Sequence, residues 1–269
     1  MVITLTTDFG LTDSYVGVMK GVILGIEPTA TVVDLCHGIR PQDVAEAAFV
    51  LGTAWNYFPA DTIHVAVVDP GVGGPRRGIA LRTAAATFVG PDNGIFSYVL
   101  AEAGVSVSQS GLRAIAPVAL AVELSEPRYW LPGPSATFHG RDIFAPVAAH
   151  LAAGVPLVAL GSAVDEIQLL PVTRPERRSD GSLAGHVLHV DQFGNLITDI
   201  RRSDLVGLTD PCFTIRGRRI RGLRRYYAEA PGLCALVGSS GRVEIALRGG
   251  SAAAELGADT GEPVTSAEC

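Results

Sequence analysis

The first half of the chain alternates between short apolar runs and stretches in which apolar residues recur every three or four positions. Val44, Ala48 and Leu51 show this helical spacing clearly. The apolar runs predict strands over residues 2–7, 31–35, 63–68, 79–83 and 86–89, and the stretches between them predict helices over 13–25, from 43 onward and up to 98. Near-continuous apolar strands that alternate with helices indicate a buried, mostly parallel sheet and the α/β fold class.

The pattern changes near residue 171. Residues 171–185 hold two prolines and three arginines together with Ser, Asp and Gly, which predicts an exposed linker. Short strand-like runs follow, separated by Gly and Asp, and predict a small antiparallel β-barrel or sandwich. These runs cover residues 186–191, 195–200, 212–216, 233–237 and 242–247. We therefore expect an α/β N-terminal domain over 1–170, a linker over 171–185 and a β C-terminal domain over 186–269.

One apolar segment, residues 144–164, raises the question of a membrane span, as does the positive mean hydropathy of +0.32. It lacks charged residues but contains Pro146, Gly154 and Pro156, too many helix breakers for a spanning helix. We expect a short Ala-rich helix, a Gly-Pro turn and then a strand here, and no membrane partner. The first ten residues include Asp8 and no basic segment, unlike a signal peptide.

Net charge and cysteine content restrict the classes of partner and the redox setting that we expect. The formal net charge of −6 argues against non-specific nucleic-acid binding. The four cysteines are far apart and form no CxxC pair: Cys36, Cys212, Cys234 and Cys269. The spacing therefore predicts neither a zinc knuckle nor a disulfide framework, and it fits a reduced, cytoplasmic setting.

Three carboxylates directly follow predicted strands of the N-terminal half: Asp8, Asp69 and Asp92. In open parallel sheets, ligands bind outside the carboxyl ends of the strands, so these residues are candidates for one site. Each of them alone is better explained as an ordinary turn or cap residue. Only their expected convergence on one edge of the sheet indicates a function.

The most unusual segment, DPGVGGPRRG, covers residues 69–78. It is not a dinucleotide-binding fingerprint, because Arg76 occupies the position of the third glycine and two prolines obstruct a helix. It is not a phosphate-binding Walker loop either, since GK[ST] is missing and Lys20 is the only lysine. The segment predicts a tight loop that brings Asp69, Arg76 and Arg77 toward the strand ends, or simply a surface ion pair of little energetic value.

A second dense segment places His139 beside Gly140, Arg141 and Asp142, just before an apolar helix. A lone histidine is usually structural, but one near a charged cluster can titrate near neutral pH. Two functional interpretations compete: a metal site that uses Asp8, Asp69, His139 and Asp142, and metal-free acid–base chemistry with arginine as a fixed charge. The absence of HxH, HExxH or HD pairs from the sequence favours the second.

The C-terminal half offers weaker signals. Residues 191–195 and 238–241 have good turn chemistry and need no functional explanation. Six arginines lie within residues 216–225, but the chain is acidic and this stretch has no interleaved aromatics. A solvated face or a subunit contact explains them better than nucleic-acid binding does.

Five motifs in this order resemble the S-adenosyl-L-methionine hydrolases that form adenosine, also called SAM hydroxide adenosyltransferases, which are relatives of fluorinases and chlorinases. The motifs are TTDFG at 6–10, VVDPGVG at 67–73 with Arg76, GPDNG at 90–94, TFHGRDIFAP at 137–146 and DQFGNLITDI at 191–200. They span essentially the whole chain. The resemblance implies an α/β N-terminal domain, a smaller β C-terminal domain and a homotrimer with active sites at subunit interfaces.

The resemblance also implies roles for individual residues. Asp69, Arg76 and His139 match the set that positions and activates water, and Asp8 matches the carboxylate that holds the ribose hydroxyls. The remaining matches are Asn195, Ser239, Glu244 and the backbone near Leu247 around adenine, Asp191 at the methionine amine, and Phe193 as an aromatic wall. The implied reaction converts S-adenosyl-L-methionine and water into adenosine and L-methionine without a metal or other cofactor.

The halogenating relatives differ at these motifs. They carry Tyr at the position of Asp69 and Tyr-Ser at the positions of His139 and Gly140, and they have a long insertion before the motif that matches residues 90–94. The hydrolase pattern is therefore favoured. Two alternatives stay open: a 5′-halogenase, and a non-catalytic module that binds adenosine or S-adenosylmethionine.

Overall fold

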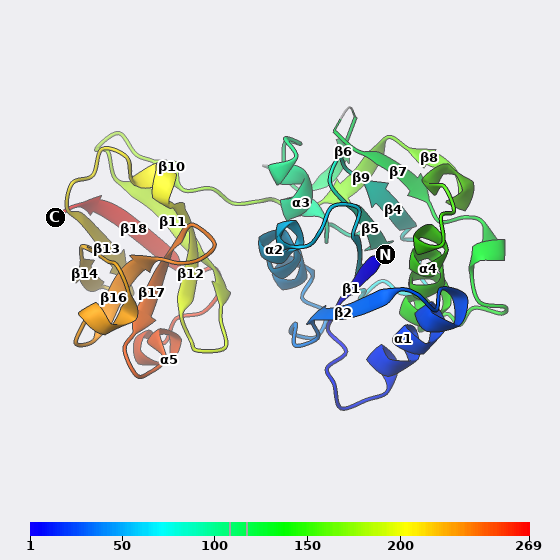
Figure 1. Ribbon diagram of the computed structural model, residues 1–269. Helices are drawn as coiled ribbons and strands as arrows, with labels where there is room; N and C mark the ends of the chain where they lie inside the picture. Colours follow the sequence, from blue (N-terminus) through cyan, green and yellow to red (C-terminus); the bar gives the residue numbers. More distant parts are fainter. Residues whose placement is uncertain (108, 117) are drawn as a thin grey trace. The chain divides into compact units, whose positions relative to one another are not determined.

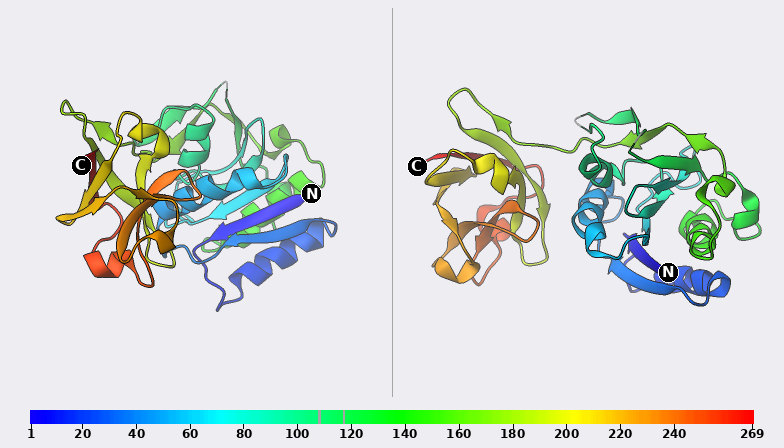
Figure 2. Two further views of the ribbon diagram at one scale, coloured as in Figure 1. Left: turned by 60° about the vertical axis from the view of Figure 1, so that its left-hand side comes forward. Right: turned by 45° about the horizontal axis from the view of Figure 1, so that its top comes forward.

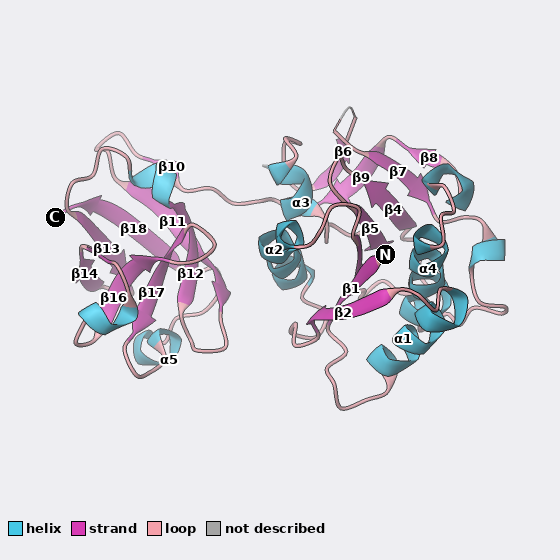
Figure 3. Cartoon of the chain, in the orientation of Figure 1, coloured by secondary structure: helices cyan, strands magenta, loops and turns pink. Residues whose placement is uncertain are grey.

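The computed structural model describes residues 1–107, 109–116 and 118–269. The chain divides into two compact units, Met1–Val172 and Thr173–Cys269. Helices cover the sheet of the first unit, whereas the second unit consists mainly of strands (Figure 3).

The first unit contains a seven-stranded sheet with a parallel half and an antiparallel half (Figure 1). In spatial order its strands are β2 (Thr31–Cys36), β1 (Val2–Thr7), β3 (Ile63–Val67), β5 (Thr87–Pro91), β4 (Gly78–Arg82), β7 (Leu120–Glu123) and β8 (Ala163–Val164). The first four strands pair in parallel. The pairs that involve β4, β7 and β8 are antiparallel. The predicted strands and the α/β class are confirmed, and the sheet is richer in antiparallel pairs than predicted.

A short connection explains the change of direction. Only residues 83–86 separate β4 from β5, and the Thr83 amide donates to the Ala86 carbonyl at 3.0 Å. A turn this short can join only antiparallel neighbours, whereas parallel strands need a crossover of a dozen residues or more. The two runs therefore form a hairpin.

Helices cover both faces of this sheet (Figure 2). Helices α1 (Tyr15–Ile26) and α4 (Ala145–Ala152) share one apolar cluster with alternate residues of β3 such as Val65. Helices α2 (Val44–Ala54) and α3 (Ser97–Glu102) share another, which includes Ala66 from the same strand. Because successive strand side chains point to opposite faces, both faces of the sheet are buried.

Local details differ from the predictions in two places. Ser14 rather than Asp13 precedes α1 at the N-cap position and makes no side-chain cap, whereas Asp43 caps α2 by accepting the Glu46 amide at 2.9 Å. The strand expected after the Gly-Pro turn at 154–156 is a 3₁₀ helix, Leu157–Leu160, and β8 begins only at Ala163. Gly161, at φ 153, separates the two and fits only as glycine, because a Cβ would lie 2.0 Å from the Glu123 carbonyl oxygen.

Smaller elements complete the first unit. Strands β6 (Gly111–Ala114) and β9 (Glu166–Leu169) form a separate antiparallel pair. Single 3₁₀ turns cover Trp55–Tyr57 and Pro127–Tyr129, and a π-helical turn, Gly140–Phe144, runs directly into α4. No helix within the described residues is long and apolar enough to cross a membrane.

The second unit is built around one large sheet whose neighbouring strands pair antiparallel, except for β15 with β16. Its strands, in spatial order, are β14 (Arg218–Arg221), β13 (Pro211–Ile215), β18 (Pro263–Glu268), β11 (Leu183–Val190), β12 (Leu196–Arg201), β17 (Arg242–Leu247), β16 (Leu233–Val237) and β15 (Leu223–Arg224), with β10 (Glu176–Arg177) beside β11. Helix α5 (Ala252–Leu256) and 3₁₀ turns at Arg202–Leu205 and Tyr227–Glu229 fill the connections. The predicted β-rich, barrel-like C-terminal fold is confirmed.

Residues 171–185 contain more regular structure than the predicted linker. Glu176–Arg177 forms β10, which pairs with β11, and β11 already begins at Leu183. A turn at 178–182, closed by the Arg178 amide on the Ser182 carbonyl at 2.8 Å, joins them. Several charged residues of this segment thus belong to an edge hairpin, which tolerates such residues, and both prolines precede it.

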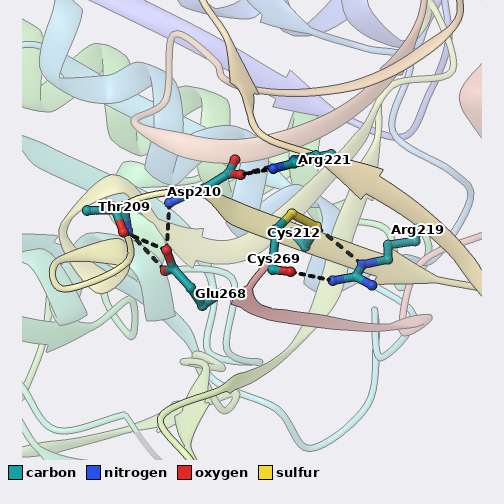
Figure 4. Close-up of a disulfide and its surroundings, with 7 residues drawn as sticks. All are labelled: Thr209, Asp210, Cys212, Arg219, Arg221, Glu268 and Cys269. Carbon is teal, nitrogen blue, oxygen red and sulfur yellow. Dashed lines mark hydrogen bonds and ion pairs between the residues drawn. A yellow bond between two sulfur atoms is a disulfide. The ribbon is translucent and has the colours of Figure 1, made fainter.

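A disulfide joins Cys212 and Cys269, with 5.1 Å between their Cα atoms (Figure 4). The expectation that the cysteines form no disulfide was wrong. Cys212 lies in β13, which pairs with β18, and the amide of Cys269 donates to the Asp210 carbonyl at 2.9 Å. Strand pairing therefore brings together two residues that are 57 positions apart in the sequence.

The arginine-rich stretch 216–225 is largely engaged in local contacts. Arg221 pairs with Asp210 at 2.7 Å, and Arg219 donates to Cys212 Sγ at 3.3 Å and to the Cys269 carbonyl at 3.2 Å. Further pairs are Arg216–Glu262 at 2.6 Å and Arg225–Glu229 at 2.7 Å. This supports the interpretation of a solvated, ion-paired face.

Candidate active site

The first unit has a pocket of about 370 Å³ at the carboxyl ends of β1 and β3. Parallel strands present their carboxyl ends at one edge of a sheet, and ligands of such sheets bind there. Asp8 follows β1 and Asp69 follows β3, while His139 reaches the same pocket from the segment before α4. The structure therefore brings together three of the predicted residues that are distant in sequence.

Arg76 lies behind this pocket and connects Asp69 with His139. Its Nε is 3.0 Å from both carboxylate oxygens of Asp69, and one terminal nitrogen makes a very close contact with Asp69 Oδ2. The same terminal nitrogen lies 2.7 Å from His139 Nδ1. Only 5% of the Asp69 side chain and 13% of the Arg76 side chain are exposed, so this ion pair is far less screened than a surface pair.

Backbone packing fixes the relative position of the two segments. Gly73 has φ 74, and a Cβ there would lie 2.3 Å from the Ala136 carbonyl oxygen. Only glycine permits this approach, which seats the loop after β3 against the segment that carries His139. The Arg76 guanidinium also lies 5.4 Å from the centre of the Phe144 ring, within cation–π range.

The π-helical turn Gly140–Phe144 aims His139 into the pocket and ends in α4. Such turns are rare and frequent at functional sites. Asp142 is buried within this turn, accepts the Ser135 amide at 2.8 Å and pairs with Arg141 at 2.6 Å. Burial would raise the pKa of Asp142, but the hydrogen bonds from Arg141 and Ser135 outweigh it and hold the pKa below its usual range. Asp142 therefore supports the turn rather than the pocket.

The charge state of His139 follows from its surroundings. Burial lowers the pKa of His139, and the Arg76 charge lowers it further, against the opposing effect of Asp69 and Asp142. Arg76 is always a donor, so His139 Nδ1 must be the acceptor and the ring proton lies on Nε2. His139 is thus a neutral imidazole at neutral pH.

Asp8 has a defined position as well. Its Oδ2 accepts the backbone amide of Gln42 at 2.8 Å, and Gln42 adopts the unusual φ of 67°. Three aromatic rings line the pocket beside it and contact one another with ring centroids 5.2 to 5.7 Å apart: Phe9, Tyr15 and Phe138. The pocket therefore combines an apolar wall with carboxylates, which suits a cationic organic ligand.

The second unit has its own pocket, of about 960 Å³. It is lined by all six C-terminal residues that the resemblance singles out: Asp191, Phe193, Asn195, Ser239, Glu244 and Leu247. Phe193 is 78% exposed, although a large aromatic side chain is normally more buried. An exposed ring at the edge of a pocket is available to stack on a flat ligand.

Asp191 organises the loop between β11 and β12. Its Oδ1 accepts the amides of Phe193 and Asn195, each at 2.9 Å, and its Oδ2 accepts from Asn195 Nδ2 at 2.9 Å. This is the turn chemistry expected for residues 191–195. The Asn195 amide is oriented by this bond, which leaves its carbonyl oxygen as the group that can accept from a ligand.

Glu244 is held from two sides at the base of the second pocket. Its Oε2 accepts from the Tyr227 hydroxyl at 3.0 Å, and a Cβ at Gly238 would lie 1.6 Å from Oε1. Burial raises the pKa of Glu244, and the charge of Asp191 adds to this, while the Tyr227 hydrogen bond opposes it. Burial and the Glu244 charge also raise the pKa of Tyr227 to about 12, so Tyr227 remains a donor.

Sequence reasoning missed several lining residues and misjudged one. Tyr15, Gln42, Tyr226 and Tyr227 line the two pockets but carry no signal of their own. Isolated aromatic residues are normally assigned to the core and a single glutamine to the surface. Asp92 does not line the first pocket. Its carboxylate accepts from Arg77 at 2.9 Å and from the Gln168 amide at 2.7 Å, so it ties β5 to β9.

The proposed metal site gains no support. Among residues 1–107, 109–116 and 118–269, no group of three or more His, Cys, Asp and Glu side chains is arranged to hold a metal ion. Arg76 donates hydrogen bonds to His139 Nδ1 and to both carboxylate oxygens of Asp69, and Arg141 pairs with Asp142. These atoms are therefore already engaged by cationic side chains. The geometry instead favours a cation-tolerant pocket with a buried Asp–Arg–His cluster.

Two family models match this chain. Residues 3–161 match the model of the SAM hydroxide adenosyltransferase N-terminal domain, and residues 185–265 match that of the C-terminal domain. The chain is 44% identical over 266 residues to an (R)-S-adenosyl-L-methionine hydrolase of Salinispora tropica, which covers 97% of this chain and 95% of that protein. A Nocardia brasiliensis fluorinase is 32% identical over 76% of this chain and 72% of its own length.

A crystal structure of an uncharacterized conserved protein from Thermotoga maritima has a TM-score of 0.87 and 32% identity, with all of both chains covered. The two family models together span both units of the chain and every motif described above. The chain therefore belongs to the SAM hydroxide adenosyltransferase family.

Proposed function

We propose that this protein hydrolyses S-adenosyl-L-methionine to adenosine and L-methionine. An oxygen nucleophile derived from water attacks the ribose 5′-carbon, and methionine leaves. The observation that carries the proposal is the contact of Arg76 with both Asp69 and His139, beside a pocket that also holds Asp8. A buried cluster of titratable groups beside a pocket is typical of sites that perform acid–base chemistry.

The residue types suit this reaction. The sulfonium leaves as a neutral thioether, so no acid is needed to protonate the leaving group. Water must lose a proton during or after its attack, and Asp69 is the group that accepts it. His139, whose Nδ1 accepts from Arg76, offers its Nε2–H to orient the attacking oxygen. Arg76 stabilises the negative charge that develops on the nucleophile, and the cluster supplies the alignment that accelerates the attack. No metal or other cofactor is part of the proposal.

The binding residues divide between the two pockets. In the first, Asp8 holds the ribose hydroxyls. In the second, Asn195, Ser239, Glu244 and the backbone at Leu247 surround adenine, Asp191 meets the methionine amine, and Phe193 forms an aromatic wall. The support is that these second-pocket residues line one cavity, with Asn195 and Glu244 each fixed by a hydrogen bond.

We also propose a homotrimer in which the first pocket of one subunit faces the second pocket of its neighbour. Each pocket alone carries only part of the groups that the substrate requires. Helix α1 and the preceding turn expose Leu11, Tyr15, Val18 and Leu24, which is an apolar surface that a subunit contact would bury.

A cytoplasmic location belongs to the same proposal because the substrate is an intracellular metabolite. The Cys212–Cys269 disulfide is the observation that weighs against it.

The deciding experiment is incubation with S-adenosylmethionine in heavy-oxygen water, followed by mass spectrometry of the products. Hydrolysis as proposed places the heavy oxygen in the 5′-hydroxyl of adenosine. Release of unlabelled adenosine, or of no adenosine by folded protein, would refute it. Added chloride tests the halogenase alternative, which predicts 5′-chloro-5′-deoxyadenosine. Tight binding without turnover would identify a binding module instead.

A further inference from the structure

A chain of hydrogen bonds runs from the protein surface to the turn that carries Asp8. Lys20 Nζ lies 2.6 Å from Asp34 Oδ2, and His37 Nε2 lies 2.9 Å from Asp34 Oδ1. His37 Nδ1 in turn lies 2.8 Å from Thr7 Oγ1, which accepts the Phe9 amide at 3.2 Å. Lys20 and Asp34 are partly exposed, whereas His37 and Thr7 are buried.

The direction of each bond follows from the charge on Asp34. Burial would raise the pKa of Asp34, but hydrogen bonds from Lys20 and His37 outweigh it and hold the pKa below its usual value. An ionised carboxylate only accepts, so His37 donates from Nε2. The Thr7 hydroxyl donates to His37 Nδ1 at 2.8 Å, and the Thr7 oxygen accepts the Phe9 amide.

The arrangement has the form of a hydrolytic Thr–His–Asp triad, but its burial excludes that role. Thr7 has no exposed surface, so its hydroxyl reaches no substrate. The bonds end instead on the backbone that follows Asp8: the Phe9 amide through Thr7, and the Gly10 amide, which donates directly to the His37 carbonyl at 2.9 Å. His37 therefore anchors the turn by both its side chain and its backbone.

We propose that Thr7 and His37 are positioning residues that fix the Asp8 carboxylate against the ribose hydroxyls of the substrate. They determine how strongly the enzyme requires those hydroxyls, although neither touches the substrate. The inference rests on the proposed function in one respect, the assignment of Asp8 to the ribose hydroxyls. Asp8 is restrained at its other side by the Gln42 amide, so a shift of the turn changes the direction of its free oxygen.

The chain contains a matched control on the same strand. Thr4 Oγ1 lies 2.8 Å from Nδ1 of His64, and both residues are fully buried, as Thr7 is. Thr4 lies in β1 three residues before Thr7, away from the Asp8 turn. Thr4→Val and Thr7→Val therefore remove the same hydroxyl from the same kind of bond, and only the second removes it beneath the pocket.

The experiment measures dissociation constants of adenosine and 2′,3′-dideoxyadenosine by calorimetry for the full-length protein and both variants. The wild type is expected to prefer adenosine by roughly tenfold or more, because the hydroxyls donate to a charged group. Thr7→Val is expected to reduce this ratio at least threefold. Thr4→Val is expected to keep it, with a comparable fall in melting temperature.

The outcomes separate the two claims. If the wild type does not distinguish the nucleosides, the role of Asp8 in the proposed function fails. If the wild type distinguishes them and Thr7→Val keeps the full ratio, the positioning inference alone is overturned. An equal loss of the ratio in Thr4→Val would also overturn it, since the effect would then be general destabilisation.

A second pair of variants covers the case in which Thr7→Val does not fold. Asp34→Ala removes the acceptor that orients His37, and it acts at a partly exposed position. Lys20→Ala removes a surface ion pair on the same carboxylate but leaves the His37 bond intact. The ratio is expected to fall in Asp34→Ala and to persist in Lys20→Ala, and the reverse would refute the inference.

Discussion

A terminal nitrogen of Arg76 lies 2.7 Å from Nδ1 of His139, so the histidine accepts a hydrogen bond from a permanent cation. This bond exists only while the imidazole is neutral. Protonation of His139 would place two donors face to face and add a second positive charge beside the guanidinium. The pH at which the Arg76–His139 hydrogen bond is lost is therefore set by protonation of His139 Nδ1.

The first prediction concerns pH. Burial and Arg76 lower the pKa of His139 below 6.5, so the neutral form persists at neutral pH and is lost as pH falls through the lowered pKa. We expect kcat/KM to be independent of His139 protonation between pH 8 and 6.5 and to decline only below that range. In Arg76→Gln, the pKa of His139 is expected to rise, because one lowering cause is gone while Asp69 and Asp142 remain. Titration of the His139 ring protons by NMR tests this, and an unchanged or lower pKa would contradict it.

The second prediction separates charge from geometry at Arg76. Lysine keeps the charge but cannot contact both oxygens of Asp69 and His139 Nδ1 from one planar group. We expect Arg76→Lys to reduce kcat by roughly 100-fold or more, as loss of one oriented donor does at other sites. Arg77→Lys is the matched control, since Arg77 pairs with Asp92 outside the pocket. Equal loss of kcat in both variants would show that the effect is structural.

The third prediction tests the shared active site. Asp69→Asn inactivates the first pocket and leaves the second intact, and Glu244→Ala does the reverse. In co-expressed mixed trimers, random assembly pairs an intact first pocket with an intact second pocket in about a quarter of sites. Activity should therefore reappear when the two inactive chains are co-expressed and not when either is expressed alone. A mixture that stays inactive while light scattering shows mixed trimers would exclude sites shared between neighbours.

The fourth prediction concerns the disulfide. Cys212 and Cys269 close a loop of 57 positions, for which the chain-entropy model gives a stabilisation of roughly 4 kcal/mol. We expect Cys269→Ser to lower the free energy of unfolding of the second unit by about 2 to 4 kcal/mol. A dithiol reductant should lower the stability of the wild type and leave that variant unaffected. Cys36→Ser is the control, because Cys36 is a free cysteine in the other unit. Equal sensitivity of all three proteins to reductant would contradict the prediction.

Much of the fold was predictable because buried strands have a local signature. The apolar runs that became β1, β3 and β16 need no information from elsewhere in the chain. Strand direction was less accessible, since β4 became antiparallel through the geometry of the four-residue turn that follows it. The 3₁₀ helix at Leu157–Leu160 was missed because a four-residue apolar run fits either structure.

The geometry of the site was less predictable from the sequence than the fold. Asp69, Arg76 and His139 stand out through the motifs around them, but the contacts of Arg76 with both partners depend on how two loops pack. Tyr227 and Glu244 are 17 residues apart and meet only through the fold. The Cys212–Cys269 disulfide was missed for this reason too, because its geometry depends on the register of β13 against β18.

The packing of Gly73 against the Ala136 carbonyl has a consequence for how such an enzyme can change its chemistry. One contact between the two reactive loops is made by backbone atoms of Gly73 and Ala136, in addition to the bonds of Arg76 with the side chains of Asp69 and His139. Exchange of either side chain therefore leaves this backbone contact in place. In such a scaffold, the backbone that shapes the site can stay the same while the reactive side chains change. Substitution of Gly73 should therefore disturb both reactive loops at once.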